Sequence, residues 1–235
     1  MKNATGVIRQ VRRSSRSVRV VLVLMLSAGT STAGLQAQGP AGGVVRAGDA
    51  RISGEGTPVT RIDQQSERAV IDWRSFGIGS GAQVNVGSLV ATPSSIETGA
   101  FMAGRLVFDA PGRPGAGVWN AGAITARDGG LVALVAPHVR NDGVIVARLG
   151  RVALGAADTF TVDLYGDALI NLALSDVHAG QLRHANGEPV TSLVTHSGQI
   201  TSGDTVLITA RGAKQVLDSL INATGTIRAE RAVQQ

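Results

Sequence analysis

The 235-residue chain has no cysteine, few aromatic residues and no long apolar run. Without cysteine it forms neither a disulfide nor a thiolate metal site, which excludes the disulfide-rich scaffolds common among exported domains. Aromatic residues make up 3% of the chain and hydrophobic residues 43%, so the core must consist mainly of valine, isoleucine, leucine and alanine. The 31 glycines suit the corners of such a core.

The basic charge of the chain is concentrated at its N-terminus. The formal net charge is +5, but six of the 22 basic residues precede residue 38 and no acidic residue does. The remainder carries 16 basic and 17 acidic groups, a net charge of −1. A folded basic surface is therefore not expected, and nucleic acid is not expected as a partner.

Residues 1–37 have the order of a secretory signal peptide. A basic segment precedes the apolar run Val20–Leu26 and the small-residue region Ser27–Ala37. The apolar run is far shorter than the roughly 20 residues that cross a bilayer, which excludes a retained anchor. We expect export through the general secretion translocon and cleavage after Ala33 or Ala37. A second barrier crossed in the unfolded state would also explain the missing cysteine, because disulfides obstruct threading.

A five-residue phrase, Gly-x-Ile-x-Ala or Ser, recurs in the second half of the chain. It occupies Gly122–Ala126, Gly143–Ala147, Gly198–Ser202 and Gly225–Ala229, and the later two copies have Ile200 and Ile227 as their isoleucines. Asn120, Gly122 and Ile124 recur 21 residues later as Asn141, Gly143 and Ile145. A unit of about twenty residues is too small to close its own core and must stack on its neighbours. The pattern predicts an all-β fold of the parallel β-helix type.

Strand alternation within the repeats predicts which side chains stack. The positions expected to face the core and to meet their equivalents in adjacent units are Ile145, Ala147, Val152 and Leu154. Asn120 and Asn141 fall at matched turns, where one asparagine side chain can hydrogen-bond the next.

Two segments interrupt the strand rhythm. The apolar spacing of Ala213–Ile221 predicts a short amphipathic helix in a loop between units. The run TVDLYGDALINLALSD, residues 161–176, predicts a β-hairpin-like excursion. The expected organisation is a signal peptide at 1–37, a flexible leader at 38–43, a first β domain at 44–175 and further repeats at 176–235 with the helix near 213–221.

The chain offers few residues for chemistry. The histidines, which share no ligand spacing, are His138, His178, His184 and His196. The clustered acids, which lie along one unrepeated run, are Asp163, Asp167 and Asp176. No catalytic, metal or cofactor-binding residue is therefore expected. The alternative is a secreted polysaccharide lyase or hydrolase, since some parallel β-helix enzymes use clustered carboxylates.

Five stretches resemble, in the same order, the N-terminal secretion domain of two-partner secretion exoproteins, the filamentous-haemagglutinin-like adhesins and haemolysins. They are AVIDWRSFGIG (69–79), GAQVNVGSLVA (81–91), FMAGRLVF (101–108), NAGAITARDGGLVALVAP (120–137) and NDGVIVARLGRVALGAAD (141–158). The resemblance implies a right-handed parallel β-helix exported through the periplasm of a Gram-negative bacterium. It also implies an outer-membrane β-barrel transporter with periplasmic recognition domains, a non-enzymatic adhesin role, and a host-cell or glycan receptor.

The chain departs from that family between the first two stretches. Family members carry two Asn-Pro-Asn motifs there, whereas this chain contains no Asn-Pro pair. The simplest account is an internal deletion of roughly two units. A degenerate remnant of a larger adhesin or haemolysin is therefore a third interpretation. The residues predicted to contact the transporter are Arg74, Ser75, Phe76 and Ile78.

Overall fold

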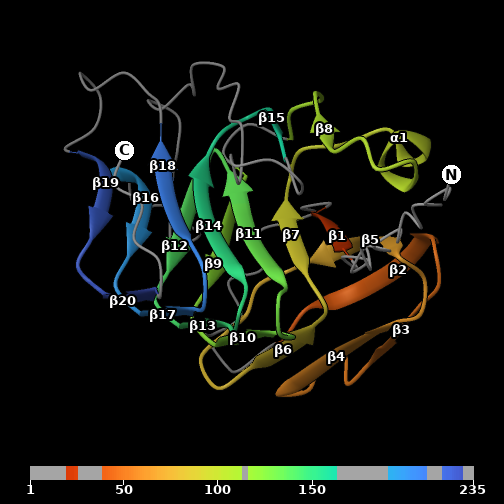
Figure 1. The fold of residues 1–235 in the computed structure, drawn as a ribbon, viewed down its shortest axis with the longest axis horizontal. Helices are drawn as coiled ribbons and strands as arrows, with labels where there is room; N and C mark the ends of the chain where they lie inside the picture. Colours follow the sequence, from red (N-terminus) through yellow and green to blue (C-terminus); the bar gives the residue numbers. More distant parts are fainter. Residues whose placement is uncertain (1–19, 26–38, 113–115, 163–189, 211–218, 230–235) are drawn as a thin grey trace, which may run out of the picture.

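The computed structural model describes residues 20–25, 39–112, 116–162, 190–210 and 219–229. Within these ranges the fold is all-β apart from one short helix, α1 (Thr98–Met102) (Figure 1). The predicted all-β class is confirmed. No helix in these ranges has the length and apolar character needed to cross a membrane.

Three larger sheets, here called A, B and C, and one strand pair make up the fold. Sheet A contains, in spatial order, β18 (Val206–Ala210), β14 (Arg151–Ala156), β11 (Leu131–Ala136), β7 (Leu89–Thr92), β1 (Val20–Met25), β5 (Arg68–Ser75) and β2 (Ala41–Ala47). Sheet B contains β20 (Thr226–Ala229), β17 (Gln199–Ser202), β13 (Val144–Ala147), β10 (Ala123–Ala126), β6 (Gln83–Val86), β4 (Val59–Gln64) and β3 (Ala50–Ser53). Sheet C contains β19 (Ser219–Ala223), β16 (Ser192–His196), β12 (His138–Asn141) and β9 (Gly117–Asn120), and the strand pair is β8 (Val107–Phe108) with β15 (Phe160–Thr161).

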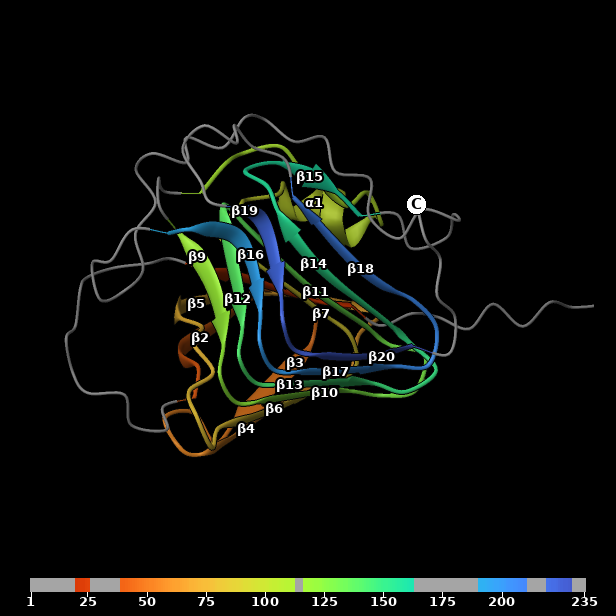
Figure 2. The same cartoon turned by 90° about the vertical axis from the view of Figure 1, so that its left-hand side faces the viewer.

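The chain passes through sheets C, B and A in turn. We call each such set of three strands a rung: β9, β10 and β11 form one, and β12, β13 and β14 form the next. Strands of neighbouring rungs pair in parallel within each sheet. Figure 2 shows the three sheets as the sides of a triangular stack.

The predicted repeat aligns in register along sheet B. Ile124 lies opposite Ile145, Ile145 opposite Ile200, and Ile200 opposite Ile227. In sheet A, Val132 lies opposite Val152, which reproduces the 20-residue offset of that part of the repeat. The positions predicted to face the core are all buried in one interior cluster: Ile145, Ala147, Val152 and Leu154.

The glycine of the repeat is required by backbone contact between rungs. The Val144 N–H donates to the Gly122 carbonyl (2.8 Å), and the Gln199 N–H donates to the Gly143 carbonyl (2.9 Å). A Cβ added at Gly143 would overlap the Gly122 carbonyl oxygen, and Gly198 has the same relation to Gly143. Glycine at this corner therefore permits the rungs to approach to hydrogen-bonding distance.

Sheet A is covered on both faces. Its inner face contributes Ile71, Leu89 and Leu134 to the interior cluster. Its outer face packs under α1, β8 and β15, seen beside β7 and β11 in Figure 1. The rings of Phe108 and Phe160 stack there with centroids 4.3 Å apart.

The start of α1 is stabilised by an acidic cap. Glu97 accepts the backbone N–H groups of Gly99 (2.8 Å) and Ala100 (2.5 Å). These two hydrogen bonds lower the pKa of the Glu97 carboxyl below its ordinary value. The cap fixes the helix that carries the buried Phe101 onto the outer face of sheet A.

Two predicted boundaries are wrong. The leader predicted as flexible at 38–43 is partly strand, because β2 begins at Ala41 and pairs antiparallel with β5. The helix predicted near 213–221 does not reach residue 221, because Leu220 and Ile221 belong to β19, which pairs in parallel with β16. Residues 211–218, and residues 163–176 of the excursion predicted at 161–176, lie outside the described residues.

At the suspected deletion site, sheets A and B differ in how their strands pair. In sheet B, β4 pairs directly with β6, so that sheet is continuous across the junction of the first two family-like stretches. In sheet A, β5 and β7 are not neighbours, because β1 lies between them and pairs with both. The apolar run of the predicted signal peptide thus forms a central strand of sheet A in this structure.

Substituting Gly143 with alanine tests the close contact between rungs. The added Cβ must displace the Gly122 carbonyl, so we expect a loss of about 1–3 kcal/mol of unfolding free energy. For a chain of this size that corresponds to roughly 2–4 °C in Tm per kcal/mol, measured by thermal circular dichroism. Gly77→Ala is the control, because a Cβ there meets no atom within 4 Å. Equal Tm values for the two variants would contradict the contact argument.

Candidate functional site at the first rungs and their corners

The four residues predicted to contact a transporter lie at the end of β5 and the corner that follows it. Phe76 and Ile78 are buried, 4% and 2% exposed, in the interior cluster. Phe76 packs edge-on against Trp73 with ring centroids 5.5 Å apart. Arg74 is exposed, whereas the side chain of Ser75 is outside what the structure describes. The side chains of Phe76 and Ile78 therefore support the core, and the contact of this region with a transporter stays a prediction.

Ile78 also serves as the first corner of the stack. Its backbone forms an isolated parallel bridge to Asn120, and its carbonyl accepts the N–H groups of Ala121 (2.7 Å) and Gly122 (3.0 Å). The Asn120 carbonyl accepts the N–H groups of Asp142 and Gly143 in the same way one rung later. The AVIDWRSFGIG stretch thus ends where the regular corner bonding begins.

The exposed end of the stack near these residues is the edge strand β2. It pairs with β5 on one side and is the last strand of sheet A. The Gly43 N–H donates to the Glu55 carboxylate (2.6 Å), which occupies one backbone donor of this strand. An edge strand whose backbone is only partly occupied can accept a strand from a partner.

Beside this edge lies a surface that we call the β2 patch, defined as Val44, Arg46, Asp72 and Arg74. Val44 is 48% exposed, which is high for a valine in a strand. Arg46 Nε lies 2.5 Å from Asp72 Oδ2 and joins β2 to β5. The exposed Arg74 leaves the patch with one more positive than negative charge. The patch combines an apolar centre with charges, as interaction surfaces commonly do.

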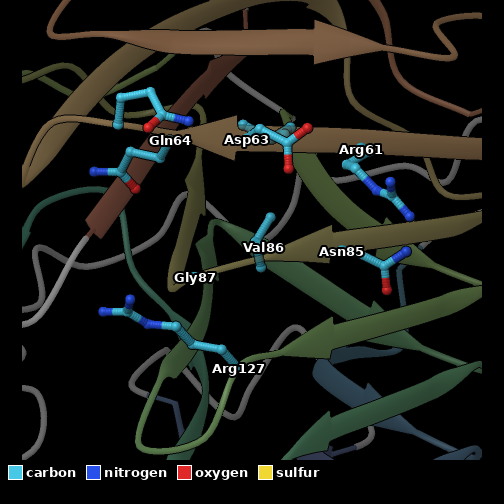
Figure 3. A pocket seen from close by; sticks show the side chains of 9 residues that line it. Arg61, Asp63, Gln64, Asn85, Val86, Gly87 and Arg127 are labelled. Carbon is cyan, nitrogen blue, oxygen red and sulfur yellow. The ribbon is translucent and has the colours of Figure 1, made fainter.

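Two hollows lie along the corner between sheets B and A. Figure 3 shows the first hollow, with Asp63 on β4 at one side and Arg127 at the other side, past Gly87. It is lined by charged and amide side chains: Arg61, Asp63, Gln64, Gln65, Asn85 and Arg127. The second is lined by Asp128, Arg148, Thr201 and Arg228 among others. Each hollow contains one carboxylate, so neither holds the carboxylate pair that glycoside hydrolysis uses.

The corner between sheets C and B contains a buried polar column. Asn120 Nδ2 donates to Asn141 Oδ1 (2.7 Å), which confirms the predicted contact between the two asparagines. Asn141 Nδ2 lies 3.0 Å from His196 Nδ1, at the next rung of the column. His196 is fully buried and occupies the repeat position of an asparagine. The spacing of the repeat could have marked this position, because His196 lies two residues before Gly198 as Asn141 lies two residues before Gly143, although the residue type differs.

Asp142 links three rungs on the outer side of the same corner. Its carboxylate accepts hydrogen bonds from Arg140 Nε (2.5 Å), Ser197 Oγ (2.6 Å) and Trp119 Nε1 (3.3 Å). Burial alone would raise the pKa of Asp142, but the hydrogen bonds from Ser197 and Arg140 outweigh it and lower the pKa below its ordinary value.

The structure describes only some of the acids and histidines named above as candidates for catalysis or metal binding. Asp163, Asp167, Asp176, His178 and His184 lie outside the described residues. His138 lies in β12, and His196 belongs to the polar column. Among the described residues, no group of three or more histidines or acids is close enough to hold a metal ion.

Comparison with known proteins gives a structural likeness but no match in sequence. No family model matches the chain, and no curated protein matches it in sequence. The structure is similar to that of the HMW1 secretion domain from Haemophilus influenzae, with 17% identity and a TM-score of 0.40. The match covers 81% of this chain and 64% of that domain, so the chain spans less than two thirds of its length. At this level the similarity assigns no function.

Replacing Asn141 with leucine tests the polar column. The change leaves the buried Asn120 amide and the His196 ring without their Asn141 partner, so we expect a loss of about 1–3 kcal/mol in unfolding free energy. Urea titration followed by circular dichroism measures it. Asn85→Leu, at a half-buried outward position of β6, is the matched control and should change stability by less than about 0.5 kcal/mol. Equal urea unfolding curves for Asn141→Leu and Asn85→Leu would show that the polar column does not stabilise the fold.

Replacing Asp142 with asparagine tests the outer link. Because folding lowers the pKa of this carboxyl, its contribution is present at neutral pH and is lost as the pH falls below the ordinary value near 3.8. The variant should therefore be less stable at neutral pH and lose less stability on acidification, as measured by urea titrations between neutral and acid pH. Ser197→Ala removes one of the hydrogen bonds and should give an intermediate slope. Parallel pH curves for wild type and Asp142→Asn would refute the link.

Proposed function

We propose that the chain is an exported, non-enzymatic exoprotein of the filamentous-haemagglutinin-like type whose rungs form a right-handed parallel β-helix. Its role is to target itself to an outer-membrane two-partner secretion transporter and to act as an adhesin at the cell surface or in the medium. The observation that carries the proposal is the in-register stacking of the Gly-x-Ile repeats through sheet B.

The family-like stretches support the proposal by their places in the fold. The first ends β5 and forms the first corner, and the second forms β6 and β7. The third contains the end of α1 and β8, which cover the outer face of sheet A. The fourth and fifth contain β10, β11, β13 and β14, the regular part of the stack. Four of the five stretches thus lie in the stack in the order of the chain, and the third lies in the cover of sheet A.

Recognition by the transporter is proposed to occur at the edge of β2. The periplasmic domains of the transporter would add a strand to this edge, and the β2 patch would provide side-chain contacts. Among the predicted contact residues whose side chains the structure describes, Arg74 is exposed beside this edge. A positive side chain at such a site affects mainly the rate of encounter with the partner.

Co-expression with and without a two-partner secretion transporter from the same genome tests the proposal. We expect the chain in the medium only when the transporter is present, measured by immunoblotting of medium and periplasm. Equal amounts in the medium under both conditions would rule the role out. Arg74→Glu should lower export, whereas Arg228→Glu, in β20 at the far end of sheet B, is the control and should not.

The remnant interpretation makes a different prediction. A degenerate fragment would show no cooperative β unfolding, whereas the stacked rungs should unfold in a single sharp transition. A polysaccharide lyase or hydrolase would instead require turnover that depends on Asp163 or Asp167.

A further inference from the structure

In sheet A, the parallel pairing of successive strands is interrupted between β5 and β7. β7, β11, β14 and β18 are direct parallel neighbours in order. Between β5 and β7 the order is broken, and β1 occupies the position between them. The adjacent strands of sheet B, β4 and β6, pair directly. The extra place is therefore confined to sheet A.

β1 is paired along both of its edges. It runs parallel to β5 from Val20 opposite Arg68 to Met25 opposite Trp73. It also runs parallel to β7, with Val21 opposite Leu89. Two strand spacings separate β5 from β7, about 10 Å in all. Without a strand between them, the facing backbone groups of β5 and β7 would be unpaired within a covered sheet.

The faces of this place set the chemistry of its occupant. On the inner side, Ile71 of β5 and Leu89 of β7 are fully buried in the interior cluster. On the outer side, Val70 and Val90 are buried beneath the α1 and β15 cover. A strand covered on both faces needs apolar residues at consecutive positions rather than at alternate ones. Val20–Met25, sequence VVLVLM, is apolar at all six positions.

We propose that the place between β5 and β7 is a strand-acceptor site, and that the apolar run Val20–Met25 is its occupant in the chain before leader removal. The ligand class is an extended apolar segment of this chain that runs parallel to both flanking strands. The site lies beside the first corner of the stack, so its occupancy determines whether β2 and β5 are joined to the remaining rungs of sheet A. This last step rests on the proposed function: removal of the leader opens the site on the exported chain.

Engineered cysteines in the full 235-residue chain test this directly, because the natural chain has none to interfere. The test variant carries Val21→Cys and Leu89→Cys, which are register partners. The control carries Val21→Cys and Val132→Cys, because Val132 is the partner of Leu89 one strand further on. After refolding in a redox buffer, tryptic mass spectrometry measures the intramolecular disulfide. We expect at least about tenfold more in the test variant, since Cα atoms two strands apart exceed the reach of a disulfide.

A second measurement does not depend on cysteines. A protease site placed within residues 27–37 of the full chain allows the leader to be cut after folding. If β5 and β7 hold the run, the cut fragment co-elutes with the folded body on gel filtration and separates only in denaturant. Val23→Pro, which removes a backbone donor within β1, should release the fragment, and Val18→Pro, outside β1, should not.

Equal cross-linking of the two cysteine variants, or immediate release of the cut wild-type fragment, would overturn the proposal. Neither experiment uses a transporter. Equal cross-linking or immediate fragment release would therefore reject the acceptor site whether or not export depends on the transporter, and export that is independent of the transporter would reject the secretion role alone.

Discussion

Close backbone contact between successive rungs is the constraint on which the structure depends. The hydrogen bonds from Val144 to Gly122 and from Gln199 to Gly143 bring each corner directly onto the one before it. Because a side chain at these glycines would overlap a carbonyl, the corner sequence cannot vary freely. The register set there carries through the adjoining strand, so that the isoleucine two residues later meets its equivalent in the next rung.

The polar column and the Asp142 link reinforce the same corner from inside and outside. Asn120, Asn141 and His196 satisfy one another's buried polar atoms, where an unpaired group would cost more than the hydrogen bond itself contributes. Asp142 connects side chains from three rungs through hydrogen bonds that are strongest when it is ionised. The corner between sheets C and B therefore specifies register by hydrogen bonding, while the interior specifies it by aliphatic packing.

Sheet A differs from the other two sheets because its central strands, such as β7 and β11, are buried on both faces. Its outer cover, built by α1, β8 and β15, brings most of the few phenylalanines into one cluster with Phe101, Phe108 and Phe160. A position covered on both faces favours a strand with apolar residues at consecutive positions. The apolar run near the N-terminus meets that requirement, although its composition also suits a signal peptide. The same six residues thus fit both the apolar run of the predicted signal peptide and a strand within a buried sheet.

The stacking repeat could be read from the sequence because glycine, isoleucine and asparagine recur at offsets equal to one rung, and equal offsets place equal residues in contact. By itself the sequence thus determined the all-β class, the register of Ile124, Ile145, Ile200 and Ile227, and the asparagine contact. It did not reveal the burial of Phe76 and Ile78, the place of His196 in the polar column, or the position of β1 between β5 and β7. Only the tertiary structure decided these features, because each depends on contacts between residues far apart in the chain that share no repeated letter.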